Sequence, residues 1–166
     1  MLSVFDGLRD VTTLSVFVRL ACALICGGII GIERSYKRRP AGFRTHILIC
    51  IGAAITTLTS QYLYLNMHYF TDMARLGAQV VAGIGFIGAG TIIVTKRQRV
   101  KGLTTAAGLW TSAIIGLTFG GGFYEGGILA TVFIMLAELV FSRLEYRVLE
   151  HVPEINVYME YEDKTC

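Results

Sequence analysis

Charged side chains at the edges of and within apolar segments are the residues that could do chemistry in this chain. Glu33 and Arg34 are adjacent at the end of the first apolar segment, and Glu138 lies inside the apolar run 134–141. Ionisable groups inside a bilayer are costly and often carry ions or protons, or pair with one another. For Glu33 and Arg34, a functional ion pair and solvation at the membrane surface remain alternatives. We expect Glu138 to face other helices, where it pairs with Arg34 or Arg44 or titrates.

Uncharged and isolated polar groups offer further candidates. Gln79 and Thr91 belong to the third apolar segment and could supply oxygen ligands, although hydrogen bonding between helices is the more common use of such groups. His46 could titrate near neutral pH, or it could serve only as a hydrogen-bonding residue. Arg19 lies near the outer end of the first segment, and we expect its side chain to extend toward the lipid headgroups.

The third apolar segment contains a glycine motif with three possible uses. Gly83, Gly85 and Gly88 form the pattern G-x-G-x-x-G, but nucleotide binding requires a preceding strand and a βαβ unit. Small residues also recur at helical spacing, which favours close packing of two helices in a membrane; these are Ala74, Ala78, Ala82, Gly85 and Ala89. Alternatively, the run Gly83–Gly90 interrupts the helix and exposes carbonyl groups to an ion.

Enzymatic chemistry is not expected. The sequence shows no nucleophile with an apparent base, no phosphate-binding loop and no cofactor lysine. Cys22, Cys26 and Cys50 do not have recognisable metal-site spacing. The acids Asp72 and Glu125 are too scattered for a Mg²⁺ cage, although Mg²⁺ keeps most of its water and needs few carboxylates. We therefore predict a non-enzymatic protein without a cofactor and leave a metal site undetermined.

The elements that position these residues are membrane helices. Of 166 residues, 54% are hydrophobic and 16% are charged, which is too apolar for an ordinary soluble domain. A bilayer core needs about 20 apolar residues of helix. Five segments qualify and predict an all-α membrane protein with five transmembrane helices; they are residues 14–32, 45–65, 74–95, 103–120 and 123–143. The last continues as a polar-faced helix to about residue 150.

The positions of Lys and Arg predict the orientation. Nine of the 15 basic residues lie in the loops after the first and third segments, and positively charged loops remain cytoplasmic. The amino terminus is therefore expected outside and the carboxyl terminus inside. The net charge of +3 predicts anionic lipid headgroups as partners. Nucleic acid is not expected as a partner.

Residues 1–150 are predicted to form the membrane domain, and residues 151–166 a cytoplasmic tail. Apolar and polar residues alternate from Ile155 to Glu162, which predicts a strand. A single strand is not stable alone. It either pairs with another copy or begins a longer cytoplasmic domain that is truncated here.

Three stretches resemble the membrane domain of the MgtC/SapB family. They are Gly-Ile-Glu-Arg with Arg-Pro-Ala-Gly-Phe-Arg-Thr-His within 31–46, the segment 78–92, and Val-Lys-Gly-Leu-Thr-Thr-Ala-Ala-Gly-Leu-Trp at 100–110. The resemblance implies an inner-membrane protein linked to low Mg²⁺, acid tolerance and survival in host cells, and many members carry an ACT-like domain after the last span. Ala82 and Met73 depart from the family pattern, where Ser and Pro are common.

Carried onto this sequence, the resemblance implies that functional residues lie in the first cytoplasmic loop, the third span and the start of the fourth. They are Glu33, Arg34, Arg39, Pro40, Arg44, Gln79, Gly83, Gly85, Gly88, Gly90, Gly102, Thr104, Thr105 and Trp110.

Two functions follow as hypotheses. In the first, the protein is non-enzymatic and alters the activity of other membrane proteins during Mg²⁺ limitation or acid stress. In the second, it transports a cation such as Mg²⁺ or a proton, with Glu138, Gln79 and the Gly83–Gly90 carbonyls along the route. A homo-oligomer, with a dimer as the first expectation, should form through a glycine or alanine face.

Overall fold

The structure is a computed structural model that describes residues 3–69, 72–94 and 100–149. The chain divides into two compact units, Met1–Ile134 and Met135–Cys166. The boundary falls inside the last apolar helix. The predicted strand at 155–162 lies outside the described residues.

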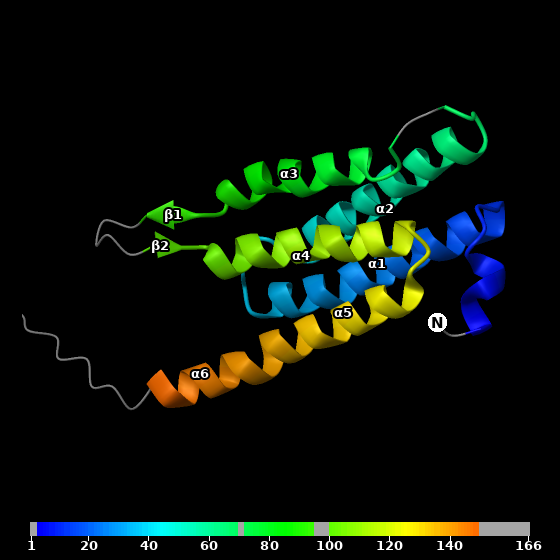
Figure 1. The fold of residues 1–166 in the computed structure, drawn as a ribbon. Coiled ribbons are helices and arrows are strands. Elements are labelled where there is room, and N and C mark those ends of the chain that lie inside the picture. Colours follow the sequence, from blue (N-terminus) through cyan, green and yellow to red (C-terminus); the bar gives the residue numbers. More distant parts are fainter. Residues whose placement is uncertain (1–2, 70–71, 95–99, 150–166) are drawn as a thin grey trace, which may run out of the picture. The chain divides into compact units, whose positions relative to one another are not determined.

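Helices account for most of the described chain (Figure 1). The first unit contains a short 3₁₀ helix η1, the helices α1 to α4, most of α5, and a small hairpin of β1 and β2. The bounds are η1 Ser3–Leu8, α1 Thr13–Tyr36, α2 Phe43–Leu65, α3 Arg75–Ala89, β1 Ile93–Val94, β2 Val100–Lys101, α4 Leu103–Gly120, α5 Tyr124–Leu136, the π-helical segment η2 Ala137–Phe141, and α6 Ser142–Leu149.

Among the described residues, four helical segments are long and apolar enough to cross a membrane. They are α1, α2, α4 and the continuous run Tyr124–Leu144. Because each coincides with a predicted segment, the prediction of a mostly helical protein with several membrane-spanning helices is confirmed.

The third span is shorter than predicted. We expected a helix over 74–95, but α3 has 15 residues and ends at Ala89. At 1.5 Å per residue it is about 22 Å long, against about 30 Å for the hydrocarbon core. The β-branched run from Thr91 to Val94 favours extended structure, and Ile93 and Val94 pair with Lys101 and Val100 in an antiparallel hairpin.

Capping residues and glycines determine where α1 and α4 begin. Thr12 caps α1, because its side chain accepts a hydrogen bond from Ser15 N and the Ser15 hydroxyl accepts one from Thr12 N. This reciprocal pair satisfies two amides that have no partner within the helix. Gly102 has φ of 97° before α4, a left-handed conformation that glycine adopts without steric cost.

Glycines bring the backbones of the central helices together. Helix α2 packs against both α1 and α4. A Cβ atom at Gly27 of α1 would lie 2.9 Å from Cys50 Cβ, and one at Gly116 of α4 would overlap the carbonyl oxygen of Cys50. Such close approach increases van der Waals contact, which is the main source of helix association in lipid. The central part of the first unit is therefore a tightly packed group of α1, α2 and α4.

The described part of the second unit is a continuation of helix. Within it, the Ser142 hydroxyl donates to the carbonyl oxygen of Glu138 at 2.5 Å, at the end of the π-helical segment. Helix α6 extends to Leu149, close to the predicted end at about residue 150.

Candidate functional site

A buried group of charged side chains lies at the carboxyl-terminal end of α1, next to the turn into α2. Glu33 and Arg34 are 7% and 1% exposed. Glu33 Oε2 accepts a 2.8 Å hydrogen bond from Arg34 Nε, and Glu33 Oε1 lies 2.6 Å from Lys37 Nζ. One carboxylate thus contacts two cations. Because removing a charge from water is costly without such partners, the arrangement stabilises Glu33 as a carboxylate.

A buried histidine extends this group toward α4. His46 is fully buried, and its Nδ1 lies 2.9 Å from the carbonyl oxygen of Gly42. Its Nε2 has no hydrogen-bond partner among the described residues and faces Gly108 of α4. Its backbone carbonyl lies directly against Gly27 of α1, the helix that carries Glu33 and Arg34. We call Glu33, Arg34, Lys37 and His46 the inner cluster.

The turn between α1 and α2 holds the inner cluster in place. The Ser35 hydroxyl accepts a 2.8 Å hydrogen bond from Phe43 N. Gly31 lies directly against the Phe43 backbone, so a larger residue there would push α2 away. These contacts fix the start of α2 beside the end of α1.

Arg19 corrects one expectation. We expected its side chain to reach the headgroups, but it is fully buried. Its guanidinium donates to Gln61 Oε1 at 2.8 Å and to the carbonyl oxygens of Gly120 at 2.8 Å, Arg9 at 2.6 Å and Leu8 at 3.3 Å. A planar group with several donors can satisfy these acceptors together. Arg19 therefore ties α1, α2, α4 and the residues before α1 to one another.

The residues before α1 form a cap at the same end. The phenyl ring of Phe5 stacks on Tyr124 with centroids 5.0 Å apart, and the Tyr124 hydroxyl donates to the Leu8 carbonyl at 3.1 Å. Arg9 donates to Glu125 Oε1 at 2.7 Å. The hydrogen bond to Asp6, followed by the interactions with Glu125, raises the pKa of Arg9 against the opposing effect of desolvation. We call this assembly around Arg19 the outer seal.

Most other predicted site residues lie apart from the inner cluster. Thr105 is buried, whereas Thr104 and Trp110 on the same helix are exposed. Arg39 and Arg44 are exposed in the turn and at the start of α2. The structure therefore buries Glu33 and Arg34 together and leaves the other predicted basic residues, Arg39 and Arg44, exposed.

The glycine motif of α3 is divided between two environments. Gly88 is buried against Ala106 of α4, while Gly83, Gly85 and Gly90 are exposed. Gln79 is also exposed. The helix is unbroken from Gly83 to its last residue, Ala89, and Gly90 is its carboxyl-terminal cap. The carbonyls of this segment therefore remain within the helix up to its last turn.

The small residues of α3 form an open face. Ala74, Ala78, Ala82, Gly85 and Ala89 are all exposed. At 3.6 residues per turn these positions share one side of the helix. No other described helix of the first unit covers them. We call them the α3 small-residue face.

Glu138 belongs to the second unit. It is half-buried and lies in the π-helical segment. Its predicted pairing with Arg34 or Arg44 stays a prediction. Among the residues that the structure describes, no three His, Cys, Asp or Glu side chains lie close enough to hold a metal ion.

Sequence reasoning missed two parts of these sites. Lys37 follows Glu33 by four residues, a spacing that places both on one helix face and could have indicated the pair. Arg19 lies near the start of α1 and Gln61 near the end of α2, and a polar partner at matching depth is the signal for a buried arginine. The backbone acceptors from Leu8, Arg9 and Gly120 had no such signal, because every residue carries a carbonyl.

Comparison with known proteins identifies related sequences. The model of the family described as the MgtC family matches residues 20–147. A protein of Escherichia coli strain K12 described as "Putative magnesium transporter YhiD" is 43% identical over 141 residues, 82% of this chain and 65% of that protein. "Protein MgtC" of Salmonella typhimurium strain LT2 is 37% identical over 131 residues, 79% of this chain and 54% of that protein.

The chain thus spans between about half and two thirds of the length of these relatives. No solved structure matches it significantly.

Proposed function

Because the chain belongs to the MgtC family, we propose that it is a non-enzymatic, multi-pass protein of the inner membrane that acts on other membrane proteins. It does so during adaptation to low magnesium or acid stress. The observation that carries this function is the α3 small-residue face, which is exposed along its whole length. Small residues let a neighbouring backbone approach closely, which is how helices associate in lipid.

The same face supports a homodimer. Two copies of α3 that meet at Ala78, Ala82, Gly85 and Ala89 would bury these positions without steric conflict, because none carries a side chain larger than a methyl group. A partner membrane protein would use the same surface. The dimer and the partner complex therefore compete in this proposal.

The outer seal supports a function without ion conduction. The fully buried Arg19 side chain fills the junction of α1, α2 and α4. A fixed positive charge at this point would repel a cation. In the proposed orientation, this end faces outward and the inner cluster lies at the cytoplasmic surface.

Cation transport is the alternative function. The buried carboxylate of Glu33 and the unsatisfied Nε2 of His46 favour it, because intramembrane ionisable groups often form proton relays. The description of the Escherichia coli relative as a magnesium transporter also favours it. Glu138 and Gln79 are further candidates along a route.

Flux through purified protein in liposomes distinguishes the two functions. Vesicles that contain the protein and a Mg²⁺ or proton indicator should show the same flux as indicator-loaded vesicles without protein, if the protein acts on other proteins. Glu33→Gln and Glu138→Gln are the test variants, and Asp72→Asn is the matched control, because Asp72 is exposed in the connection between α2 and α3. A flux that both test variants abolish and the control retains would establish transport instead.

A further inference from the structure

A pocket with an apolar half and a basic half lies near the end of the last apolar helix. Helix α5, the segment η2 and helix α6 follow one another in a continuous ribbon (Figure 1). The pocket has a volume of about 260 Å³, and its lining residues are Val140, Arg143, Leu144 and Arg147. All four belong to the second unit, so the pocket is formed within that unit alone.

The four lining residues follow the spacing of one helix face. Positions i, i+3, i+4 and i+7 lie on the same side of a helix, and the lining residues are at 140, 143, 144 and 147. Each arginine follows an apolar lining residue by three positions. All four side chains are exposed. The pocket is therefore open to a ligand from the lipid and from the membrane surface.

The length of the helix places the two arginines at the level of the lipid headgroups. The apolar run Tyr124–Leu144 has 21 residues and is about 31 Å long at 1.5 Å per residue. A hydrocarbon core is about 30 Å thick. Arg143 lies at the end of this run, and Arg147 follows it by about 6 Å along the helix axis. Val140 thus lies at the edge of the hydrocarbon core, where the acyl chains begin.

A phosphate group fits between the two arginines. Residues four apart on a helix are neighbours, and like charges at this spacing repel each other. The oxygens of one phosphate can accept charge-assisted hydrogen bonds from both guanidinium groups, which replaces repulsion by attraction. Because Arg143 and Arg147 are both exposed and both line the pocket, one ligand can reach them together.

We propose that this pocket binds one anionic phospholipid, with its phosphate between Arg143 and Arg147 and an acyl chain against Val140 and Leu144. The two halves of the pocket match the two parts of one lipid molecule. In the proposed orientation this end faces the cytoplasmic leaflet, whose surface is negative. The site requires only that the run Tyr124–Leu144 cross a bilayer, and it is independent of the function proposed above.

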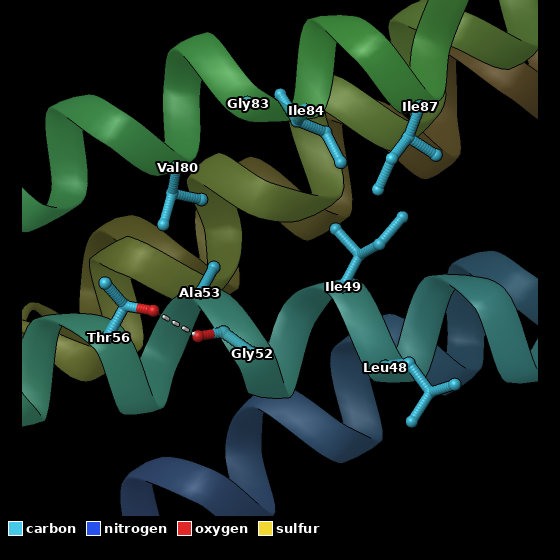
Figure 2. A pocket seen from close by; sticks show the side chains of 9 residues that line it. All are labelled: Leu48, Ile49, Gly52, Ala53, Thr56, Val80, Gly83, Ile84 and Ile87. Atoms are coloured by element: carbon cyan, nitrogen blue, oxygen red, sulfur yellow. Dashed lines mark hydrogen bonds between the residues drawn. The ribbon is translucent and has the colours of Figure 1, made fainter. Parts of the chain in front are cut away.

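A second pocket, between α2 and α3, supplies a comparison within the same chain. Figure 2 shows Ile87 of α3 and Ile49 of α2 pointing toward each other across this pocket. Its described lining residues include no charged side chain. An apolar surface of this kind accepts acyl chains without regard to the headgroup. A preference for anionic lipid should therefore come from the arginine pocket.

Native mass spectrometry of the full chain in mild detergent measures the affinity for the first bound lipid. Phosphatidylglycerol and phosphatidylcholine with identical acyl chains are added separately. Phosphatidylglycerol should bind about twentyfold to thirtyfold more tightly, the effect of two basic residues at the membrane surface. Arg143→Gln or Arg147→Gln alone should reduce this preference to about fivefold, and the double variant should remove it.

Lysine variants separate the charge from the paired hydrogen bonds. Arg143→Lys and Arg147→Lys keep the positive charge but lose the planar arrangement of donors that matches a phosphate. Each should retain part of the preference for phosphatidylglycerol. They also test the site if a glutamine variant does not fold.

Two control variants should leave the preference unchanged. Arg38→Gln removes one exposed positive charge from the turn after α1. Gly83→Leu places a large side chain in the pocket between α2 and α3, where an added Cβ would meet no atom within 4 Å. Neither change touches the arginine pocket.

The apolar half of the pocket is tested with two leucines. Leu144→Ala should weaken binding of both lipids by about threefold or more, because the acyl chain loses apolar contact. Leu139→Ala makes the same change at a position that does not line the pocket, and it should leave binding unchanged.

Four results would overturn the proposal. The first is equal affinity for the two lipids in the wild-type protein, and the second is a preference that survives in the double glutamine variant. The third is an equal loss of preference in Arg38→Gln and Arg143→Gln, because charge would then act without a site. The fourth is displacement of phosphatidylglycerol by excess inorganic phosphate, which would indicate a site for a free anion in place of a lipid.

Discussion

Arg19 on α1 donates a 2.8 Å hydrogen bond to Gln61 on α2, and the same guanidinium donates to the Gly120 carbonyl at the end of α4. One side chain thus joins α1 to residues near the carboxyl-terminal ends of α2 and α4. In an apolar environment each unsatisfied acceptor is costly, so this residue is central to the stability of the first unit.

Arg19→Ala should lower the free energy of unfolding by about 3 kcal/mol, because Gln61 and three carbonyls lose their donor. Gln61→Ala should cost about 1 kcal/mol, since Arg19 keeps its three carbonyl acceptors. Unfolding by sodium dodecyl sulfate in mixed micelles measures both. Arg38→Ala, at an exposed position in the turn after α1, is the control. Equal stability of Arg19→Ala and wild type would contradict the role of the outer seal.

Glu33 and Lys37 should differ in their effect on stability. Glu33→Ala removes the carboxylate that contacts both Arg34 and Lys37 and should cost about 3 kcal/mol, as is typical when a buried ion pair is broken. Lys37→Ala should cost less than about 1 kcal/mol, because its side chain is partly exposed to solvent. Unfolding by sodium dodecyl sulfate gives the loss in free energy of unfolding for each variant, and the ratio of the two losses checks this prediction. A larger loss for Lys37→Ala would refute the geometry of the inner cluster.

Gly116→Ala should prevent correct folding, because the added methyl group would overlap the Cys50 carbonyl. Gly85→Ala should be tolerated and should stabilise α3 by up to about 1 kcal/mol, the difference in helix propensity. The fraction of monodisperse protein after detergent extraction measures both outcomes. Similar yields of the two variants would show that α2 and α4 are not in close contact.

Gly85→Leu should weaken any homodimer by at least about tenfold, because a large side chain on the small-residue face separates the helices. Gly83→Leu is the matched control on the side of α3 that faces α2 (Figure 2) and should leave the dimer intact. Energy transfer between labelled copies in liposomes reports the equilibrium. A wild-type protein that is monomeric in this assay would remove the basis for the dimer.

The orientation is tested with two introduced cysteines at the ends of α2. Arg39 precedes α2 and Met67 follows it, and both positions are exposed. In intact cells an impermeant thiol reagent should label Met67→Cys and not Arg39→Cys, with Cys166 replaced by Ser. The reverse pattern would invert the proposed topology.

The limits of the sequence predictions have physical causes. The ends of α4 were predictable because Lys101 and Gly102 precede its apolar segment and glycines follow it, whereas α1 continues four residues beyond its predicted end at 32. The third span was predicted too long, since Thr91 to Val94 are apolar enough for a membrane helix but β-branched, and pairing with Val100 and Lys101 makes them a hairpin. Apolarity alone does not distinguish these two structures.

The sites were predictable only in part. Glu33 and Arg34 are neighbours in sequence, so their pairing was among the alternatives. The position of Arg19 depends on acceptors far away in sequence, including Gly120, which is 101 residues distant. No local pattern encodes such a contact. The exposure of the α3 small-residue face likewise follows from the packing of α3 on α4 and not from its own spacing.

The 15-residue length of α3 has a consequence for the surrounding lipid. This helix falls about 8 Å short of an average hydrocarbon core, whereas α1 and α2, with 24 and 23 residues, do not. Lipids beside α3 must compress to match it, while those beside α1 need not. The protein should therefore create an asymmetric thin patch in the bilayer. Its assembly should depend on acyl-chain length, with short-chain lipids relieving the compression around α3.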